Sequence, residues 1–371
     1  MTKAAELAKM GEVLTNSQIG GRRNIVINGG MNVAQRSSSA VTGIGASDGY
    51  FTCDRWNFNT NGNSAGRLTM SQASDGPSGF ANCLKLECTT ADTSIAAAER
   101  FFIEQKLEGQ DVQQLKKGTS DAEKITISFY VKGHDSATYT VGLYEGTSGR
   151  KIAATFPVTT SWVRQTVTFD GDTSGVIPDN NTAQLHLRFY LHAGSNYTSG
   201  TLGTSWNADG NTTQISSDGN SFFESTSATF FLTGVQLEVG SQATPFEHRS
   251  YGEELALCQR YCIDLNPASG GQSTSPYLML GSVYNSTLVI ANVSLPHEMR
   301  VAPTLILTGD AGNFSVVEVA SVRPCTGFGV NGMASSGGGI NWTCAGGGMT
   351  GGNAALIYVE TNLRCIMDSE L

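Results

Sequence analysis

The feature that most constrains this chain is a series of short segments, between residues 24 and 249, in which apolar and polar residues alternate. In residues 125–131 and again in 185–191, the odd-numbered positions are apolar. A period of two with one polar face is typical of a half-buried antiparallel strand. Gly, Asn, Asp and Ser separate the segments and favour turns. The pattern predicts a β-sandwich of the jelly-roll type. Its expected strands are 24–28, 67–72, 83–88, 100–107, 124–132, 138–145, 162–169, 183–192 and 228–239.

The fold class is therefore expected to be mainly β, in three parts. Residues 1–23 are predicted to form an N-terminal anchor helix and a hinge, and residues 24–250 the jelly-roll sandwich, with one short helix near 111–117. Residues 251–371 are expected to form a connecting helix, over 251–263, and a C-terminal β-sandwich head. The strands expected in that head are 277–283, 287–293, 304–308, 315–320 and 355–363.

A glycine-rich stretch interrupts the C-terminal block. Between Gly327 and Gly352, 11 of 26 residues are glycine. Glycine loses the most conformational entropy on folding and contributes no side chain to packing. We therefore expect no ordinary strand or helix here, but either a mobile loop or a backbone-packed feature that is stabilised by neighbouring chains.

The predicted N-terminal helix has only a narrow apolar stripe, formed by Leu7, Met10 and Leu14. Three buried side chains, at roughly 1.5–3 kcal/mol each, do not offset the entropy lost by ordering a dozen residues. A helix this short is marginal in water. We expect it to dock on another copy or on a partner, with a frayed tail as the alternative.

The composition excludes several classes of function. The net charge is −9, and only 15% of the residues are charged. Such a chain offers no basic stripe to bind a phosphate backbone, so no nucleic-acid partner is expected. Neither a secretory signal nor an apolar run of membrane-spanning length occurs, so no membrane insertion is expected. The eight cysteines form no CxxC pair and have no histidine at ligand spacing, which favours buried free thiols.

Sequence motifs for catalysis lack the context that they need. Two GxSxG matches, at 45–49 and 62–66, lie in polar loops rather than between a strand and a helix. A GxGxxG match from Gly327 opens no helix. The five histidines are scattered. We therefore expect no enzyme activity and no cofactor.

One sequence motif suggests a calcium site. Asp170, Asp172 and Ser174 follow the first half of a calcium-loop pattern, in which alternate oxygen ligands converge on a hard cation. Position twelve of the pattern is Asn181 instead of a bidentate glutamate. A polar turn is the alternative interpretation.

Aromatic residues among small polar ones are the candidate ligand-binding residues. The segment 193–221 is long for a loop, and it contains Tyr197, Trp206 and Asp209. Amphipathic rings with polar neighbours suit stacking on a sugar, and Asp and Asn can accept hydrogen bonds from the sugar hydroxyls. Trp342, in the C-terminal block, is a fourth candidate. The alternative is that these rings fasten the loop to its own sandwich.

Four long phrases resemble one known group of proteins. They are NIVINGGMNVAQR (24–36), YFTCDRWNF (50–58), TFDGDTSGVIPDNNTAQLHLRFYLHAGSNYTSG (168–200) and FFLTGVQLEVGSQATPFEHRSYGEELALCQRYC (230–262). Together they resemble tail-fibre and fibre-like virion proteins of tailed marine phages, over about residues 1–262. LPHEMRVAPT (295–304) resembles the opening of the C-terminal head of such proteins.

The resemblance implies a set of properties. They are a jelly roll like that of carbohydrate-binding modules, a homotrimer, an N-terminal segment that attaches to other virion proteins, and a distal C-terminal head. The chain is then a virion structural protein, assembled in the host bacterial cytoplasm, that contributes to attachment to host-surface glycans. Two alternatives remain: a capsid-decorating or tail-scaffold protein without host binding, and a glycan depolymerase of the tailspike kind.

Overall fold

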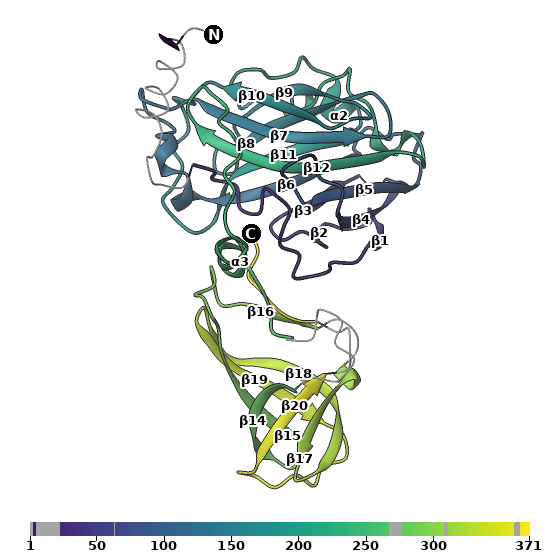
Figure 1. The fold of residues 1–371 in the computed structure, drawn as a ribbon, viewed down its shortest axis with the longest axis vertical. Coiled ribbons are helices and arrows are strands. Elements are labelled where there is room, and N and C mark those ends of the chain that lie inside the picture. The colour runs from purple at the N-terminus through teal and green to yellow at the C-terminus, as the bar shows by residue number, and fades with distance from the viewer. Residues whose placement is uncertain (1–2, 5–22, 63, 267–276, 308–310, 360–363) are drawn as a thin grey trace. The chain divides into compact units, whose positions relative to one another are not determined.

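The computed structural model describes residues 3–4, 23–62, 64–266, 277–307, 311–359 and 364–371, and the protein is mainly β (Figure 1). The chain divides into two compact units: residues 1–254 with Leu371, and residues 255–370. The predicted anchor residues Leu7, Met10 and Leu14 lie outside the described residues. In the described ranges, no helix is both long enough and apolar enough to cross a membrane.

The first unit is a sandwich of two six-stranded antiparallel sheets (Figure 1, purple to green). Sheet A has the order β1-β4-β5-β12-β7-β10, and sheet B has the order β2-β3-β6-β11-β8-β9. The strands of sheet A are β1 (Val41–Ile44), β4 (Arg67–Ala73), β5 (Cys83–Thr90), β12 (Thr229–Val239), β7 (Ile125–Gly133) and β10 (Val163–Phe169). Those of sheet B are β2 (Gly49–Tyr50), β3 (Asn57–Asn61), β6 (Arg100–Glu108), β11 (Ala183–Ala193), β8 (Ala137–Glu145) and β9 (Lys151–Val158).

The apolar positions of the alternating segments form the core between the two sheets. Phe129 of β7 and Phe189 of β11 are fully buried, and their ring centroids lie 4.9 Å apart. Trp56 is also buried and packs on Phe189, with centroids 6.2 Å apart. The alternation therefore predicted correctly which face of each strand turns inward. The predicted helix near 111–117 is instead two 3-10 turns, η1 (Gly109–Asp111) and η2 (Gln113–Leu115).

The segment predicted as the first strand, 24–28, is an irregular arm held by side-chain hydrogen bonds. Asn24 is buried, and its Oδ1 accepts the backbone N–H groups of Val26, at 3.0 Å, and Leu237, at 3.1 Å. Its Nδ2 donates to the carbonyl of Val235 at 3.0 Å. One amide side chain thus replaces part of a strand ladder and joins the arm to β12.

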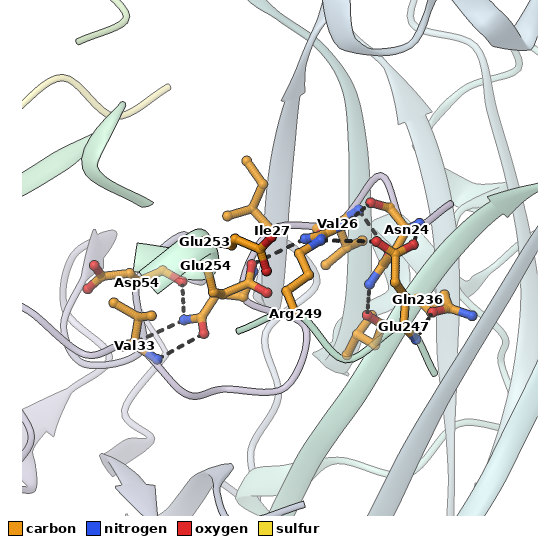
Figure 2. Close-up of polar contacts among 12 residues, drawn as sticks. Asn24, Val26, Ile27, Val33, Asp54, Gln236, Glu247, Arg249, Glu253 and Glu254 are labelled. Atoms are coloured by element: carbon orange, nitrogen blue, oxygen red, sulfur yellow. Dashed lines mark hydrogen bonds and ion pairs between the residues drawn. The ribbon is translucent and has the colours of Figure 1, made fainter. Parts of the chain in front are cut away.

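Charged residues that follow β12 complete the attachment of the arm (Figure 2). Arg249 donates to the carbonyl oxygens of Val26, at 3.1 Å, and Asn24. Glu254 accepts the N–H of Asn28 at 2.5 Å, and Glu247 accepts the N–H of Asn24 at 2.8 Å. Two of the phrases that carry the phage resemblance, 24–36 and 230–262, therefore meet in one hydrogen-bond network.

The second unit contains a closed barrel and a small sheet, where a second sandwich was expected (Figure 1, green to yellow). The barrel order is β14-β15-β19-β18-β17-β20, and the three-stranded sheet has the order β13-β21-β16. The barrel strands are β14 (Tyr277–Asn285), β15 (Leu288–Ser294), β19 (Gly337–Cys344), β18 (Ser321–Ala334), β17 (Phe314–Glu318) and β20 (Ala354–Val359). The other elements are β13 (Cys262–Asp264), β21 (Cys365–Asp368), β16 (Thr304–Leu307) and η5 (Ala311–Asn313). Helix α3 (Tyr251–Gln259) contains residues of both units.

Much of the glycine-rich stretch lies in strands β18 and β19, contrary to the expectation that it forms no ordinary strand. The reason is close backbone approach. A Cβ on Gly338 would lie 2.7 Å from the carbonyl oxygen of Gly332, and a Cβ on Gly339 would lie 3.0 Å from that of Asn331. Glycine is therefore required at Gly338 by its own hairpin partner.

Candidate functional site

The turn proposed to bind calcium holds cationic side chains of the protein itself. Asp172 is buried, and its carboxylate accepts hydrogen bonds from Lys117 Nζ at 2.8 Å and from Arg150 Nε at 2.8 Å. Burial alone would raise the pKa of Asp172, but hydrogen bonds from Arg150 and Lys117 lower it. Lys117 Nζ also donates to the carbonyl of Gly175 at 2.8 Å. The carboxylate is therefore already neutralised, which favours the polar-turn interpretation over calcium.

The other two residues of the proposed calcium set do not converge with Asp172. Asp170 is 79% exposed and pairs with Lys124, and Ser174 is exposed. The backbone N–H of Ser174 donates to Asp172 at 3.0 Å, as in a turn. No cluster of three or more His, Cys, Asp or Glu side chains that could hold a metal occurs among the described residues.

Trp206 and Asp209 join this same corner of the sandwich. The indole N–H of Trp206 donates to the carbonyl of Asp170 at 2.7 Å, and Lys117 Nζ lies 5.1 Å from its ring centroid. Lys151 donates to the carbonyl of Asp209, whose side chain is exposed. The structure thus brings together residues from two separate sequence hypotheses. Because its N–H and one ring face are engaged, Trp206 fastens the loop.

Tyr197 lies apart from Trp206, in a small buried cluster on the outer face of sheet B. Its ring is 6% exposed and packs with Phe102, Tyr190 and Ile215. The Arg100 guanidinium lies 4.4 Å from the Tyr197 ring centroid. The surrounding segment is ordered, with α2 (Ser195–Thr198), η3 (Asn211–Thr213) and η4 (Phe222–Glu224). Neither face of the Tyr197 ring is left open for a sugar, which corrects its assignment.

Trp342 belongs to the second unit and is fully buried in its barrel. It packs on Phe314, with centroids 5.3 Å apart, and on Phe328, with centroids 6.4 Å apart. A ring in this position stabilises the barrel and presents no surface to a sugar, so this assignment is also corrected. The four candidate sugar-binding residues therefore do not form one site.

An ionic cluster lies on the outer face of sheet B. Glu104 is 1% exposed and lies 3.0 Å from His186 Nδ1 and 2.9 Å from Arg188 Nε. Burial alone would raise the pKa of Glu104, but its hydrogen bond with His186 and the charge of Arg188 lower it to about 2. The guanidinium of Arg188 stacks on Tyr144, 4.2 Å from the ring centroid. Since these groups satisfy one another, the cluster is a cross-strand brace rather than an open site.

Ser221, His192 and Glu99 form a hydrogen-bonded chain whose order resembles a hydrolase triad. Ser221 Oγ lies 2.8 Å from His192 Nδ1, and His192 Nε2 lies 3.3 Å from Glu99 Oε2. The His192 side chain is fully buried, which lowers its pKa to about 4, so it is a weak base at neutral pH. Ser221 Oγ also accepts the N–H of Phe223 at 3.1 Å and thereby caps η4. We assign Ser221, His192 and Glu99 a structural role.

A row of aromatic rings on the outer face of sheet A is the strongest candidate for a ligand surface. Phe231 of β12 lies opposite Lys132 of β7 and Lys85 of β5. Lys132 Nζ is 4.4 Å from the Phe231 centroid and 5.3 Å from that of Trp162, and these two rings are 6.1 Å apart. The Trp162 ring is half-buried, and its indole N–H is buried with no hydrogen-bond partner among the described residues.

Further rings extend this row along the same face. Phe80 contacts Tyr130 of β7, with centroids 5.2 Å apart, and Phe246, with centroids 5.0 Å apart. His248 lies 4.9 Å from Phe246 and is exposed. A bulge at Gly234, where φ is +60°, gives Phe80 and Tyr130 room over β12. We call these six residues the aromatic band: Phe80, Tyr130, Trp162, Phe231, Phe246 and His248.

The aromatic band has the chemistry that the sequence hypothesis placed in the loop at 193–221. Five of its six rings are partly exposed, on the face of the sheet opposite the core. Such amphipathic rings can stack on the apolar face of a sugar, while Lys85 and Lys132 can donate to hydroxyls. Sequence reasoning missed the band, although Tyr130 falls on the polar face of the alternating segment 125–131.

Apolar side chains also form a continuous strip on the outside of the barrel. Three register pairs connect this strip. Leu280 of β14 lies opposite Leu356 of β20, and Leu356 lies opposite Val317 of β17. Val317 in turn lies opposite Val322 of β18. Leu280 is 63% exposed and Val322 is 56% exposed, and Tyr284 on β14 is 69% exposed. Exposed apolar surface that crosses four neighbouring strands is typical of an interaction surface. We call these five residues the barrel strip.

Comparison with known proteins gives distant structural likenesses. No family model matches the chain, and no curated protein matches it. One similar structure is the enzymatically active domain of tailspike protein 4 of bacteriophage CBA120, with a TM-score of 0.30, 10% identity, and coverage of 58% of this chain and 21% of that chain. This chain thus spans about a fifth of that structure's length.

Two further structures are carbohydrate-binding modules. A CBM4 structure has a TM-score of 0.28 and 12% identity, with coverage of 57% of this chain and 97% of that chain. The family 11 module of Clostridium thermocellum, in complex with a mixed-linked tetrasaccharide, has a TM-score of 0.28 and 10% identity, with coverage of 57% and 100%. At these TM-scores, no function is inferred from the likeness.

Proposed function

We propose that this chain is a non-enzymatic, fibre-like virion protein of a tailed phage, and that its first unit binds host-surface glycans. The resemblance of the phrases at 24–36 and 230–262 to fibre proteins supports the virion role. Hydrogen bonds of Asn24, Arg249 and Glu254 join these two segments, so the segments belong to one folding unit. The proposed location is the virion, after assembly in the host cytoplasm.

The observation that carries the glycan proposal is the aromatic band on sheet A. The Trp162 ring, which is half-buried beside Lys132, and the partly exposed rings of Phe80 and Tyr130 offer stacking surface next to a hydrogen-bond donor. In the cluster around Glu104 on sheet B, by contrast, the charged groups satisfy one another.

A glycan array, followed by calorimetric titration of the best ligand, tests this proposal. We expect Trp162→Ala to weaken binding by at least about fivefold, since one aromatic stacking contact contributes on the order of 1 kcal/mol or more. Tyr144→Ala is the matched control, because the Tyr144 ring is also half-buried but lies on the outer face of sheet B. Binding that Trp162→Ala leaves unchanged would contradict the band as the site.

The same assay separates the alternative functions. A protein that binds no glycan on the array would support a capsid-decorating or tail-scaffold role. Release of reducing ends from a polysaccharide would support a depolymerase, and Ser221, His192 and Glu99 would then be the first residues to substitute.

Self-association is the second part of the proposal, and a homotrimer is its expected form. The barrel strip supports it, because a charge-free apolar row on a barrel surface is stabilised by burial against a like surface. Light scattering should give a mass near three times 39.2 kDa. Leu356→Asp should reduce this to the mass of the monomer, and Asn292→Asp, on the exposed part of β15, should not.

The N-terminal segment is proposed to attach the chain to other virion proteins. Removal of residues 1–23, which include Leu7, Met10 and Leu14, should leave the trimer intact and abolish incorporation into the virion. Dissociation on truncation would instead make this segment the oligomerisation element.

A further inference from the structure

The barrel of the second unit brings two cysteines directly opposite each other. Cys325 of β18 and Cys344 of β19 are register partners in this antiparallel pair. The N–H of Cys344 donates across the other edge of β19, to Thr287 at 2.8 Å, and the N–H of Ala345 donates to Pro324 at 3.0 Å. This pattern makes Cys325 and Cys344 a non-hydrogen-bonded pair.

That type of pair has the geometry that a disulfide needs. Opposite residues at non-hydrogen-bonded positions have Cα atoms about 4.5 Å apart, with their side chains closer than at hydrogen-bonded positions. Disulfides occur at Cα separations of about 4.4–6.8 Å. Among the strand pairings in the described part of the chain, Cys325 and Cys344 are the only two cysteines in register with each other.

Both side chains point into the barrel interior, toward each other. Cys325 is 1% exposed and Cys344 is 3% exposed, and both belong to the same hydrophobic cluster. A hydrogen bond from the Cys325 thiol favours the thiolate of Cys344, as does the positive charge of Arg323, so the pKa of Cys344 lies below its usual value. Cys344 is therefore the better nucleophile of the two.

We propose that Cys325 and Cys344 form a cross-strand disulfide when the protein is exposed to a low-molecular-weight disulfide. The Cys344 thiolate attacks one sulfur of that disulfide, forms a mixed disulfide and releases one small thiolate. Cys325 then loses its proton to solvent and attacks Sγ of Cys344, which releases the second small thiolate. Two protein thiols are oxidised, and one small disulfide is reduced to two thiols.

The bond would close a loop around the glycine-rich hairpin. Residues 326–343 lie between the two cysteines and include the tips of β18 and β19. A disulfide stabilises mainly by restricting the unfolded chain, and glycine-rich chain has the most freedom to lose. The same sequence that makes this hairpin costly to order thus gains from the cross-link.

Incubation of the full chain with oxidised glutathione tests the proposal. The native protein has eight free cysteines, and we expect two fewer thiols after oxidation, with a cross-linked peptide that joins Cys325 to Cys344. Calorimetry should show one transition shifted upward by several °C, on the order of 4 °C or more, and dithiothreitol should reverse the shift. Because both side chains are buried, oxidation should be slow and should accelerate with temperature.

Variants keep the test decisive. Cys325→Ala combined with Cys344→Ala should fold and show no oxidant-dependent shift, whereas Cys83→Ala should retain it. Eight remaining thiols in the wild type after incubation near the unfolding temperature would overturn the proposal. A stable glutathione adduct on Cys344 without the cross-link, or a bond between other cysteines, would also overturn it.

Discussion

Lys117 Nζ lies 2.8 Å from Asp172 Oδ2, and both side chains are almost fully buried, at 3% and 2% exposure. The pair stands at the turn where the sequence pattern suggested a calcium ion. An ammonium group that also donates to the carbonyl of Gly175 supplies the positive charge there. The spacing of acidic residues in this turn therefore predicts that a cation neutralises them, but it does not predict whether that cation is a metal ion or a lysine side chain.

The first prediction concerns this ion pair. Asp172→Asn should lower the free energy of unfolding by about 3–5 kcal/mol, because removal of one partner leaves a buried charge uncompensated. Asp170→Asn is the matched control. Its carboxylate is 79% exposed, so it should change stability by less than about 1 kcal/mol. Urea unfolding followed by circular dichroism measures both values.

Calcium provides an independent check on the same turn. Melting curves of the wild type in calcium and in EDTA should coincide, since Lys117 and Arg150 already neutralise Asp172. A melting temperature that rises with calcium, and no longer does so in Asp170→Asn, would show that the turn does bind the ion.

The strands could be predicted from sequence because each needs only local alternation. Eight of the nine segments predicted in the first unit are strands, and the ninth, 24–28, became an arm because Asn24 and Arg249 supply its hydrogen bonds. Four strands of the first unit were missed: the short strands β1, β2 and β3, and β9. Alternation is weak in KIAATFPV, the sequence of β9.

The candidate site could not be predicted, because it depends on contacts between distant segments. Only the strand order of sheet A and the bulge at Gly234 place Trp162, Phe231 and Phe246 on the same face. A tryptophan in a polar stretch also gives no sign of whether it is exposed. Trp342, which shares strand β19 with three glycines, is fully buried because its side chain lies in the interior of the closed barrel.

The second prediction concerns pH and His192. Burial lowers the pKa of His192 from its ordinary 6.5 to about 4, so the unfolded chain takes up this proton first as the pH falls. The stability that neutral His192 provides is complete above pH 6.5 and is lost between pH 6.5 and 4. The difference in pKa corresponds to about 3 kcal/mol.

Variants at two histidines isolate this effect. His192→Gln cannot ionise, so its unfolding free energy should fall less steeply between pH 6.5 and 4 than that of the wild type. His134→Gln, at an exposed position, should follow the wild type. Glu99, whose pKa is raised by burial, acts in the opposite direction, so the comparison between variants carries the result. Equal slopes for all three proteins would refute the assignment.

The third prediction concerns the bulge beneath the aromatic band. Gly234→Ala should lower stability by about 2–4 kcal/mol. It combines a left-handed backbone, at about 1–2 kcal/mol, with a Cβ placed 2.7 Å from the Phe80 ring and 2.8 Å from the Tyr130 ring. Gly43→Ala has a similar φ of +76° but no atom within 4 Å, so it should show the backbone cost alone. Thermal unfolding of both variants measures the difference, and equal losses would mean that the rings move aside freely.

The last prediction concerns the arm and Asn24, whose side chain makes three hydrogen bonds in a buried place. Asn24→Ala should cost about 3–5 kcal/mol, because the N–H groups of Val26 and Leu237 and the carbonyl of Val235 lose their partner, at about 1–3 kcal/mol for each group left unsatisfied. Asn59→Ala, where the lost amide contact is an exposed one to Asp48, should cost less than about 1 kcal/mol.

Limited proteolysis distinguishes local from global effects of that substitution. If Asn24 fastens the arm, cleavage in Asn24→Ala should begin within residues 23–36 under conditions in which the sandwich resists the protease. Cleavage that begins equally in β12 would show that the arm and the sheet unfold together. A variant as resistant as the wild type would mean that Arg249 and Glu254 hold the arm without Asn24, since their contacts to Val26 and Asn28 survive the substitution.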